Sequence, residues 1–401
     1  MKLSNRSAYR AALMIAIIVA ITIASVRLHA DTGVCGGASI TSPFVDVPNT
    51  NIFFCSIAEA FFSGLSNGTD ATHYSPSANV PREQMAAFVT RTLDQSLKRG
   101  SRRAVLDQYW TPTSADGLGL TTVGTIPNLV RFDGSDLWVA NANSDTVSRV
   151  RASNGKLLET WTGALAAFGV VAAKGLIFVT GELSAGKLYQ IDPTQPVGAV
   201  TTLSVTLGIH PRGISFDGAR IWTANSGNGS AGSGSVSIVA LNPLSVTTVT
   251  TGFGQPTGIL YDGANMWVTD SSGGLKKLDS NGNIILTVPV GGGPSFPVFD
   301  GTNIWVPNLP DSTVSVVRAS TGVVLATLTG NGLSIPETAA FDGERILVTN
   351  SGNHSVSLWK SADLSPLGSV GTGPGTFPMG ACSDGLNFWI TMGGTLKLAR
   401  F

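Results

Sequence analysis

The stretch FDGSDLWVAN at residues 132–141 decides the fold, because the chain repeats it. Close copies are FDGARIWTAN (216–225), YDGANMWVTD (261–270) and FDGTNIWVPN (299–308), and looser ones are AAKGLIFVTG (172–181), FDGERILVTN (341–350) and SDGLNFWITM (383–392). The apolar residue that anchors each copy falls at Trp138, Phe178, Trp222, Trp267, Trp305, Leu347 and Trp389. A period of about 42 residues with short strands is typical of β-propeller blades.

One repeat contains four strand patterns. PNLVRF (127–132) ends at an Asp-Gly turn, and LWVAN (137–141), TVSRVRA (146–152) and LLETWTG (157–163) follow. The last repeat has only three, and GLGLTTVGT (117–125) can supply its fourth. We therefore predict a mainly β chain with a seven-bladed propeller over 109–401. The strand near 117–125 completes the last blade and hides both edges.

The composition excludes some partners. Only 12% of the 401 residues are charged, and 25 basic residues balance 25 acidic ones without a dominant block of either sign. No electrostatic footprint for nucleic acid is present, so no nucleic-acid partner is expected.

The first 30 residues resemble a targeting segment. Lys2, Arg6 and Arg10 precede an apolar run over 11–25, and Ala30 offers a small residue for cleavage. We predict a secretory signal peptide over 1–30; an uncleaved anchor is the alternative. The run is short for a membrane span of about 20 residues. The remaining chain, with 21 basic and 25 acidic residues, is expected to be extracellular or at the cell surface and not integral to the membrane.

The three cysteines fit that compartment. Cys35 and Cys55 can form a disulfide in an oxidising environment, where a loop of about 20 residues gives roughly 3 kcal/mol of stabilisation. Two free thiols are the alternative. Cys382 lies in an apolar strand pattern and is expected to be a buried small hydrophobe.

Residues 31–108 change to helical spacing. CSIAEAFFSGLSNG (55–68) and REQMAAFVTRTLDQSL (82–97) read as helices, and the second has Met85, Phe88, Val89 and Leu93 on one face after Pro81. KRGSRR (98–103) is a basic linker that could also meet an anionic polymer.

FVDVP (44–48), IAEAFFSGLSNG (57–68) and YSPSANVPREQMAAFVTR (74–91) together resemble one S-layer homology motif. The resemblance implies association with a cell-envelope polymer through the matching Arg82. Pro81 stands where the family has Thr, and the chain has one motif instead of three. A small helical spacer or assembly module is the alternative.

The repeat has a resemblance of its own. LWVANANSDTVSRVRASNGKLLETW (137–161) and ILVTNSGNHSVSLWKSADLSPLGSV (346–370) resemble the YVTN-type propeller repeat of bacterial and archaeal surface proteins, which carries no catalytic set. Propeller enzymes of the virginiamycin B lyase kind are also similar. That resemblance implies a His, acidic residues and a divalent metal at the channel mouth.

Binding residues are expected where the chain enters the first strand of each blade. This rim consists of Asn128, Phe168, Arg212, Thr257, Ser295, Glu337 and Met379. All but Phe168 follow a proline directly, and the side chain differs in every blade. Varied side chains on a rigid frame are how such folds build binding sites.

Three side chains at this face can do chemistry. Arg212 and Glu337 are three blades apart, nearly across the channel. The alternative to a functional role is that they form an ion pair that simply keeps the channel mouth polar. His210, in GIHPRG, is either an exposed loop histidine or an acid–base partner of Glu337. His354 lies on the same face. The residues at the second-strand exits are expected to form turns: Asn141, Asn225, Asp270, Asn308 and Asn350.

These patterns favour an exported binding or interaction protein whose propeller face contacts a ligand, an envelope polymer or a surface protein. No metal ligands recur at a suitable spacing, and no cofactor is expected. The alternatives are a lyase or hydrolase that uses His210 and Glu337, or a structural subunit of a surface coat. The oligomeric state is left open.

Overall fold

The computed structural model describes residues 30–35, 38–62, 65–100, 119–230 and 232–401. The chain divides into two compact units, Met1–Ser101 and Arg102–Phe401, and each is described by itself. The predicted signal peptide over 1–30 lies outside the described residues except for Ala30. In the described part of the chain, no helix combines the length and the apolar character that a bilayer span needs.

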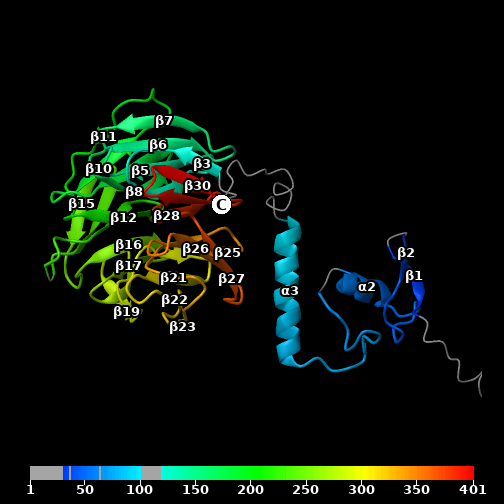
Figure 1. The fold of residues 1–401 in the computed structure, drawn as a ribbon. Coiled ribbons are helices and arrows are strands. Elements are labelled where there is room, and N and C mark those ends of the chain that lie inside the picture. The colour runs from blue at the N-terminus through cyan, green and yellow to red at the C-terminus, as the bar shows by residue number, and fades with distance from the viewer. Residues whose placement is uncertain (1–29, 36–37, 63–64, 101–118, 231) are drawn as a thin grey trace, which may run out of the picture. The chain divides into compact units, whose positions relative to one another are not determined.

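The second unit is built from seven four-stranded antiparallel sheets, which confirms the predicted propeller (Figure 1). Blade 1 contains β4 (Pro127–Phe132), β5 (Asp136–Asn141), β6 (Thr146–Arg151) and β7 (Leu157–Thr162). Blade 2 contains β8 (Ala167–Ala173), β9 (Leu176–Gly181), β10 (Lys187–Ile191) and β11 (Thr201–Thr202). Blade 3 contains β12 (Pro211–Phe216), β13 (Ile221–Asn225), β14 (Ser235–Leu241) and β15 (Leu244–Val249).

The remaining blades follow in the same order. Blade 4 contains β16 (Pro256–Tyr261), β17 (Met266–Asp270), β18 (Gly274–Leu278) and β19 (Ile284–Val288). Blade 5 contains β20 (Val298–Phe299), β21 (Asn303–Asn308), β22 (Thr313–Arg318) and β23 (Val324–Leu328). Blade 6 contains β24 (Pro336–Phe341), β25 (Arg345–Asn350), β26 (Ser355–Lys360) and β27 (Pro366–Gly371). Blade 7 contains β28 (Pro378–Ser383), β29 (Phe388–Met392), β30 (Lys397–Arg400) and β3 (Gly119–Thr122).

The ring closes in blade 7 as the sequence predicts. The strand β3 pairs antiparallel with β30, and Leu120 lies opposite Ala399. Lys397 Nζ also donates to Thr122 Oγ1 at 2.7 Å. The first strands of neighbouring blades contact one another, so they lie around the axis and their starts form the rim.

The repeated anchors are buried between blades. All seven anchor side chains are 0% exposed. Trp138 of blade 1, for example, shares a hydrophobic cluster with Ile177 and Val179 of blade 2. Cys382 is likewise 5% exposed and packs against Leu137 in the next blade, which is the buried role expected for it.

In five blades the Asp of the Asp-Gly turn holds the Trp anchor. Asp133 Oδ1 accepts hydrogen bonds from the backbone N–H groups of Ser135 and Asp136, which form the turn. Its Oδ2 accepts one from Trp138 Nε1 at 2.7 Å. The same 2.7 Å bond occurs at Asp217–Trp222, Asp262–Trp267, Asp300–Trp305 and Asp384–Trp389. The repeated phrase is therefore conserved between blades because one Asp fixes both the turn and the anchor.

A threonine on the second strand ties each of four blades to the next. Thr180, Thr269, Thr349 and Thr391 each accept a hydrogen bond from an N–H of their own first strand. Their hydroxyls also donate to the carbonyls of Arg212, Ser295, Met379 and Asn128, respectively, in the following blade. Because all four acceptors are rim residues, these bonds set the backbone from which the rim side chains project.

The first unit has a small core of its own. Its elements are β1 (Thr32–Cys35), β2 (Ala38–Thr41), α2 (Phe54–Phe62) and α3 (Arg82–Gly100). Phe44, Val47, Phe54 and Ile57 are buried together. Cys35 and Cys55 form a disulfide with their Cα atoms 5.5 Å apart, which joins β1 to α2.

Asp46, in the FVDVP stretch, positions the loop before α3. Its carboxylate accepts hydrogen bonds from the N–H groups of Tyr74 and Ser75 at 2.9 and 2.7 Å. This Asp is therefore needed to hold a loop of this unit, whatever the unit binds.

The helices of this unit differ from the sequence prediction in two ways. The helix expected over 55–68 spans only Phe54–Phe62, and Ser66–Thr69 forms no helix. The helix α3 starts at Arg82 after Pro81, as expected, but two residues of its predicted apolar face, Met85 and Val89, are 51% and 62% exposed, while Phe88 is half-buried. The small core is complete without these side chains, since loop residues such as Phe44 and Tyr74 fill it instead.

Candidate functional site

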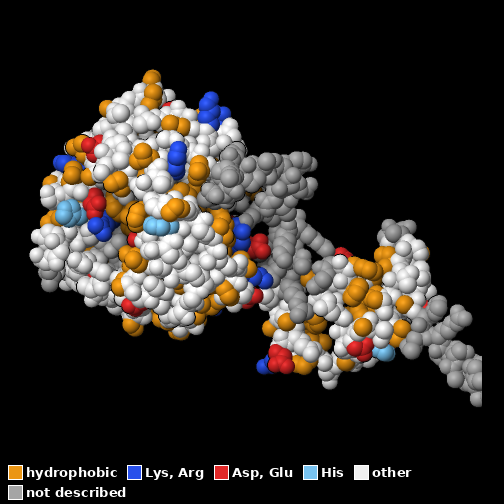
Figure 2. Space-filling view, in the orientation of Figure 1, with side chains coloured by type: hydrophobic (Ala, Val, Ile, Leu, Met, Phe, Trp, Pro, Cys, Tyr) orange, Lys and Arg blue, Asp and Glu red, His pale blue; other side chains and the backbone are white. Residues whose placement is uncertain are grey.

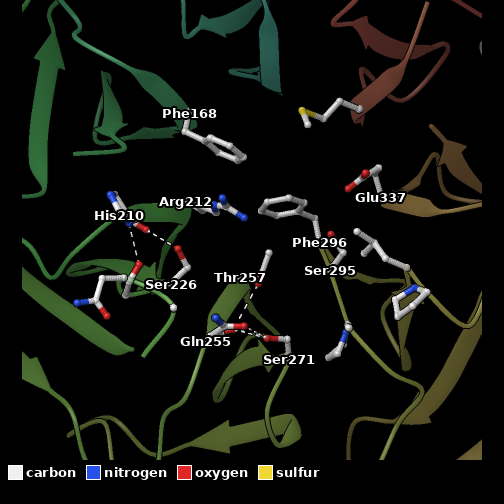
Figure 3. A pocket seen from close by; sticks show the side chains of 18 residues that line it. Phe168, His210, Arg212, Ser226, Gln255, Thr257, Ser271, Ser295, Phe296 and Glu337 are labelled. Carbon is white, nitrogen blue, oxygen red and sulfur yellow. Dashed lines mark hydrogen bonds between the residues drawn. The ribbon is translucent and has the colours of Figure 1, made fainter. Parts of the chain in front are cut away.

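Six of the seven predicted rim residues meet at one pocket of about 520 Å³ on the channel face (Figure 3). They are Phe168, Arg212, Thr257, Ser295, Glu337 and Met379, and His210 lines the same pocket. Asn128 does not, because its side chain is buried and its amide donates to the carbonyl of Ala167 in blade 2. The entering positions therefore converge on one concave site.

Two phenylalanines form the floor of this pocket. Phe168 of blade 2 and Phe296 of blade 5 are 6% and 7% exposed, and their ring centroids are 5.8 Å apart. Leu129 of blade 1 completes the cluster. Since Phe168 and Phe296 come from blades three apart in the ring, their contact fills the channel beneath the rim.

Sequence reasoning missed Phe296. Blade 5 reads Pro-Ser-Phe-Pro, where blades 3, 4 and 7 read Pro-Arg-Gly, Pro-Thr-Gly and Pro-Met-Gly. The Phe thus replaces the glycine two positions after the proline. Its backbone also leaves the regular pattern, because Phe296 N–H donates to the carbonyl of Glu337 and its carbonyl accepts from Ala339 N–H. Blades 1 and 6 also lack this glycine, with Leu129 and Thr338 in its place, so the available signal was an aromatic residue at the position.

Arg212 is held by blade 2. Its Nε donates to Glu182 Oε1 at 2.6 Å, and its guanidinium carbon lies 5.5 Å from the centroid of the Phe168 ring. The ion pair considered between Arg212 and Glu337 does not form, because Glu182 follows directly after β9 in the neighbouring blade and is closer. Glu182 was not among the predicted residues, although it directly follows the VTG that ends the second strand.

Glu337 lies on the other side of the pocket (Figure 3). Burial raises the pKa of its carboxyl, and this outweighs the Ser351 hydroxyl, which donates to Oε1 at 3.0 Å, and the positive charge of Arg212. The carboxyl can thus be neutral at a higher pH than an exposed glutamate.

We expect Glu337→Gln to make the propeller equally stable or more stable at pH 7, by up to about 1 kcal/mol. The folded-state pKa is raised, so the native protein binds more protons than the unfolded chain and loses stability as pH rises above the ordinary glutamate value. Denaturant unfolding at pH 4 to 7 should show this loss in the native chain and not in the variant.

Ser351→Ala is the control for this result. It removes the hydrogen bond that favours the ionised carboxylate but leaves the carboxyl in place, so the decline with pH should become steeper. Equal slopes in all three proteins would contradict the assignment to Glu337.

His210 is fixed by its backbone and by one ring nitrogen. Nδ1 lies 2.7 Å from the carbonyl oxygen of Gly227, which can only accept, so Nδ1 carries the proton and Nε2 of the neutral ring is an acceptor. Its φ of 50° is in the left-handed region. The equivalent residues of four other blades share this conformation: Ile126, Ala166, Ile335 and Phe377. The strained backbone of His210 is therefore a feature of the repeat and carries no catalytic meaning.

The second-strand exit residues bridge strands. The side-chain amides of Asn141, Asn225, Asn308 and Asn350 donate to Ser148, Ser237, Ser315 and Ser357 on the third strands. In blade 4, Asp270 instead pairs with the buried Lys276 at 2.6 Å. His354 packs edge-on against Phe377 with centroids 4.5 Å apart. These residues stabilise the blades, beyond the turn-forming role expected of the exits.

Among the residues that the structure describes, no three or more His, Cys, Asp or Glu side chains are grouped so that they could hold a metal ion. Arg82 is exposed at the start of α3 and is not among the residues that line the nearby pocket of the first unit, which include Gln84 and Phe88.

Comparisons with known proteins support the fold. No family model matches the chain, and no curated protein matches it. Virginiamycin B lyase from Staphylococcus aureus is similar in structure, with a TM-score of 0.59 and 15% identity, over 71% of this chain and 98% of the lyase chain. A catalytically inactive variant of that lyase with quinupristin has a TM-score of 0.59 and 14% identity, over 71% of this chain and 98% of its own. Hydrazine synthase from Kuenenia stuttgartiensis has a TM-score of 0.58 and 17% identity, over 70% of this chain and 97% of its own. At these identities the likeness concerns the propeller fold alone.

Proposed function

We propose that this is an exported binding protein, at the cell surface or secreted, whose channel-face pocket takes a ligand. The observation that carries the proposal is the convergence of six varied rim side chains and His210 on one pocket. The seven-blade frame requires a common backbone at these positions, but it does not require different side chains. Variation at one geometric position on a rigid frame indicates selection for recognition.

The pocket has the properties of a small-molecule or peptide-end site. Its volume of about 520 Å³ falls within the range of such sites, and it combines an aromatic floor with a few polar groups. Arg212 is oriented by Glu182 through Nε, which leaves its terminal nitrogens to face the pocket, where Thr257 and Ser295 also lie (Figure 3). A guanidinium presented in this way suits a carboxylate or another planar anion.

The S-layer-like unit would hold the protein at the envelope. Support comes from the order of FVDVP, the two helices and Arg82, and from Asp46, which fixes the loop before α3. The proposal assigns envelope association to this unit and ligand contact to the propeller. On the face that Figure 2 shows, the charged side chains of the propeller are few and scattered and form no large patch of one sign.

A lyase or hydrolase is the second candidate. His210 has an acceptor nitrogen at Nε2, Glu337 has a carboxyl with a raised pKa, and both line the same pocket. This pair could act as base and acid, and the fold is shared with a lyase. A divalent-cation-dependent activity that is lost in both His210→Ala and Glu337→Ala would favour the enzyme.

Co-sedimentation of the whole chain with envelope material from the source organism tests the binding function. We expect Arg82→Ala to weaken pelleting if the first unit holds the envelope. Arg212→Gln should weaken pelleting at least tenfold only if the ligand belongs to the envelope, and should otherwise reduce capture of a soluble ligand from the culture medium. Arg151→Gln, an exposed arginine outside the pocket, is the matched control. Unchanged binding to both materials in the Arg212 variant would contradict the proposal.

A further inference from the structure

The residue just before the entering proline of each blade, or before Ala167 in blade 2, divides the ring into two sides. In blades 3, 4 and 5 this residue is His210, Gln255 or Gly293, and all three line the pocket. In blades 6, 7 and 1 it is Ile335, Phe377 or Ile126; in blade 2 it is Ala166, and Leu165 lies one residue earlier. These last four side chains, which we name the apolar arc, are 44%, 52%, 38% and 50% exposed.

The apolar arc lies on the same face as the pocket. The carbonyls of Ile126, Ile335 and Phe377 accept hydrogen bonds from the second-strand exits of their own blades, as the carbonyl of His210 does. Moreover, Ile335 and Phe377 are each two residues before a side chain that lines the pocket, Glu337 and Met379. A ligand that fills the pocket and extends past its mouth over blades 6 and 7 therefore meets the arc.

Without a partner, the apolar arc lowers the stability of the folded chain. Ile126, Ile335 and Phe377 have φ values of 50°, 48° and 45°, and for a β-branched residue such values are true outliers. Glycine adopts them without strain, and blade 5 uses Gly293 (φ 55°) at the matching position. Exposure of apolar side chains adds a second cost, which the edge-on contact of the His354 ring with Phe377 offsets at one of the four positions only in part. A bound partner would cover the exposed apolar surface.

We propose that the partner is a peptide whose free C-terminal carboxylate is bound by Arg212 and whose apolar side chains lie on the apolar arc. This inference rests on the proposed function of the pocket and specifies its ligand class. Separate apolar side chains, one on each blade, match the spaced side chains of a peptide better than they match one continuous acyl chain. The hydroxyl and amide groups of Ser226, Gln255 and Thr257 in the pocket suit peptide amides.

Affinity selection tests this proposal. The whole chain without residues 1–30 is incubated with a synthetic hexapeptide library that has free carboxylates and with the same library amidated, and retained peptides are identified by mass spectrometry. We expect retention of free-carboxylate peptides rich in apolar residues. Arg212→Gln should lose the preference for the free carboxylate, and Ile126→Gly/Ile335→Gly/Phe377→Gly should retain at least tenfold less peptide.

Two controls separate recognition from folding. Val197→Ser/Ile285→Ser/Leu367→Ser removes three apolar side chains outside the pocket and the arc that are 51–55% exposed, and it should retain peptides as the native chain does. The arc variant should unfold at the same temperature as the native chain or higher, because glycine relieves the left-handed strain.

Three outcomes would overturn the peptide assignment: equal retention by the arc variant and the control variant, equal retention of the two libraries, or no retention by the native chain. If peptides are not retained but Arg212→Gln still weakens binding to envelope or medium components, the pocket stands and only the ligand class is wrong. If both results are negative, the pocket itself is wrong.

Discussion

Trp267→Ala is expected to lower the free energy of unfolding of the propeller by about 3–5 kcal/mol. The indole is fully buried and packs with Leu275 and Ile304 between blades 4 and 5, so truncation leaves a cavity that the two rigid sheets cannot close. The variant also strands Asp262 Oδ2, which accepts from Trp267 Nε1 at 2.7 Å. Denaturant unfolding of the whole chain, followed by Trp fluorescence and circular dichroism, measures the loss.

A double-mutant cycle with Asp262→Ala tests whether the turn and the anchor act as a unit. Each single variant should lose the shared hydrogen bond, so the double variant should cost less than the sum of the two by about 1–2 kcal/mol. Asp262→Asn keeps an acceptor and a turn former and should cost less than Asp262→Ala. Strictly additive losses would show that the 2.7 Å contact has no energetic weight.

Gly169→Ala should be as damaging, and it should also affect the pocket. A Cβ at residue 169 would lie 2.2 Å from the carbonyl oxygen of Arg212 and 2.9 Å from Thr180 Oγ1. Backbone of the neighbouring blade cannot move away without breaking the bond from Thr180 to that same carbonyl. We expect a loss of about 3 kcal/mol or more in unfolding free energy, together with weaker ligand binding at Arg212.

Gly371→Ala is the matched control for that substitution. No atom lies within 4 Å of the Cβ that would be added, and the residue is exposed on β27. Its effect should be within about 0.5 kcal/mol of zero, or slightly stabilising, because alanine restricts the unfolded chain. If both glycine variants had similar effects, the close approach of the first strands around the axis would not be a constraint.

The fold could be predicted because its signals are repeated. The Asp-Gly turn and the aromatic anchor recur at a nearly constant period, and the last repeat visibly lacks a strand, so the closure by β3 follows from counting. The helices of the first unit were harder to place, because Met85 and Val89 have helical spacing but remain exposed. A single amphipathic helix does not specify what covers it.

The site could be predicted only in part. The rim follows from position in the repeat, so its residues were available from the sequence, and the structure brings six of them together. Pairing across blades depends on distance, which the sequence does not contain. Arg212 could not be assigned to Glu182 instead of Glu337, and the Phe168–Phe296 floor joins residues 128 positions apart. The apolar arc is defined by backbone φ angles and side-chain exposure, and neither can be predicted from the sequence.

The pairing of β3 with β30 has a consequence for the synthesis of the protein. Thr122 pairs with Lys397, which is 275 residues later in the chain. The outer strand of blade 7, β3, therefore has no partner until translation of the propeller is almost complete. Closing a loop of that length costs about 5 kcal/mol in chain entropy. The ring therefore remains open at one blade while six others can already form. Nascent chains in that state expose two unpaired sheet edges, and they are the species that chaperones would need to protect from aggregation.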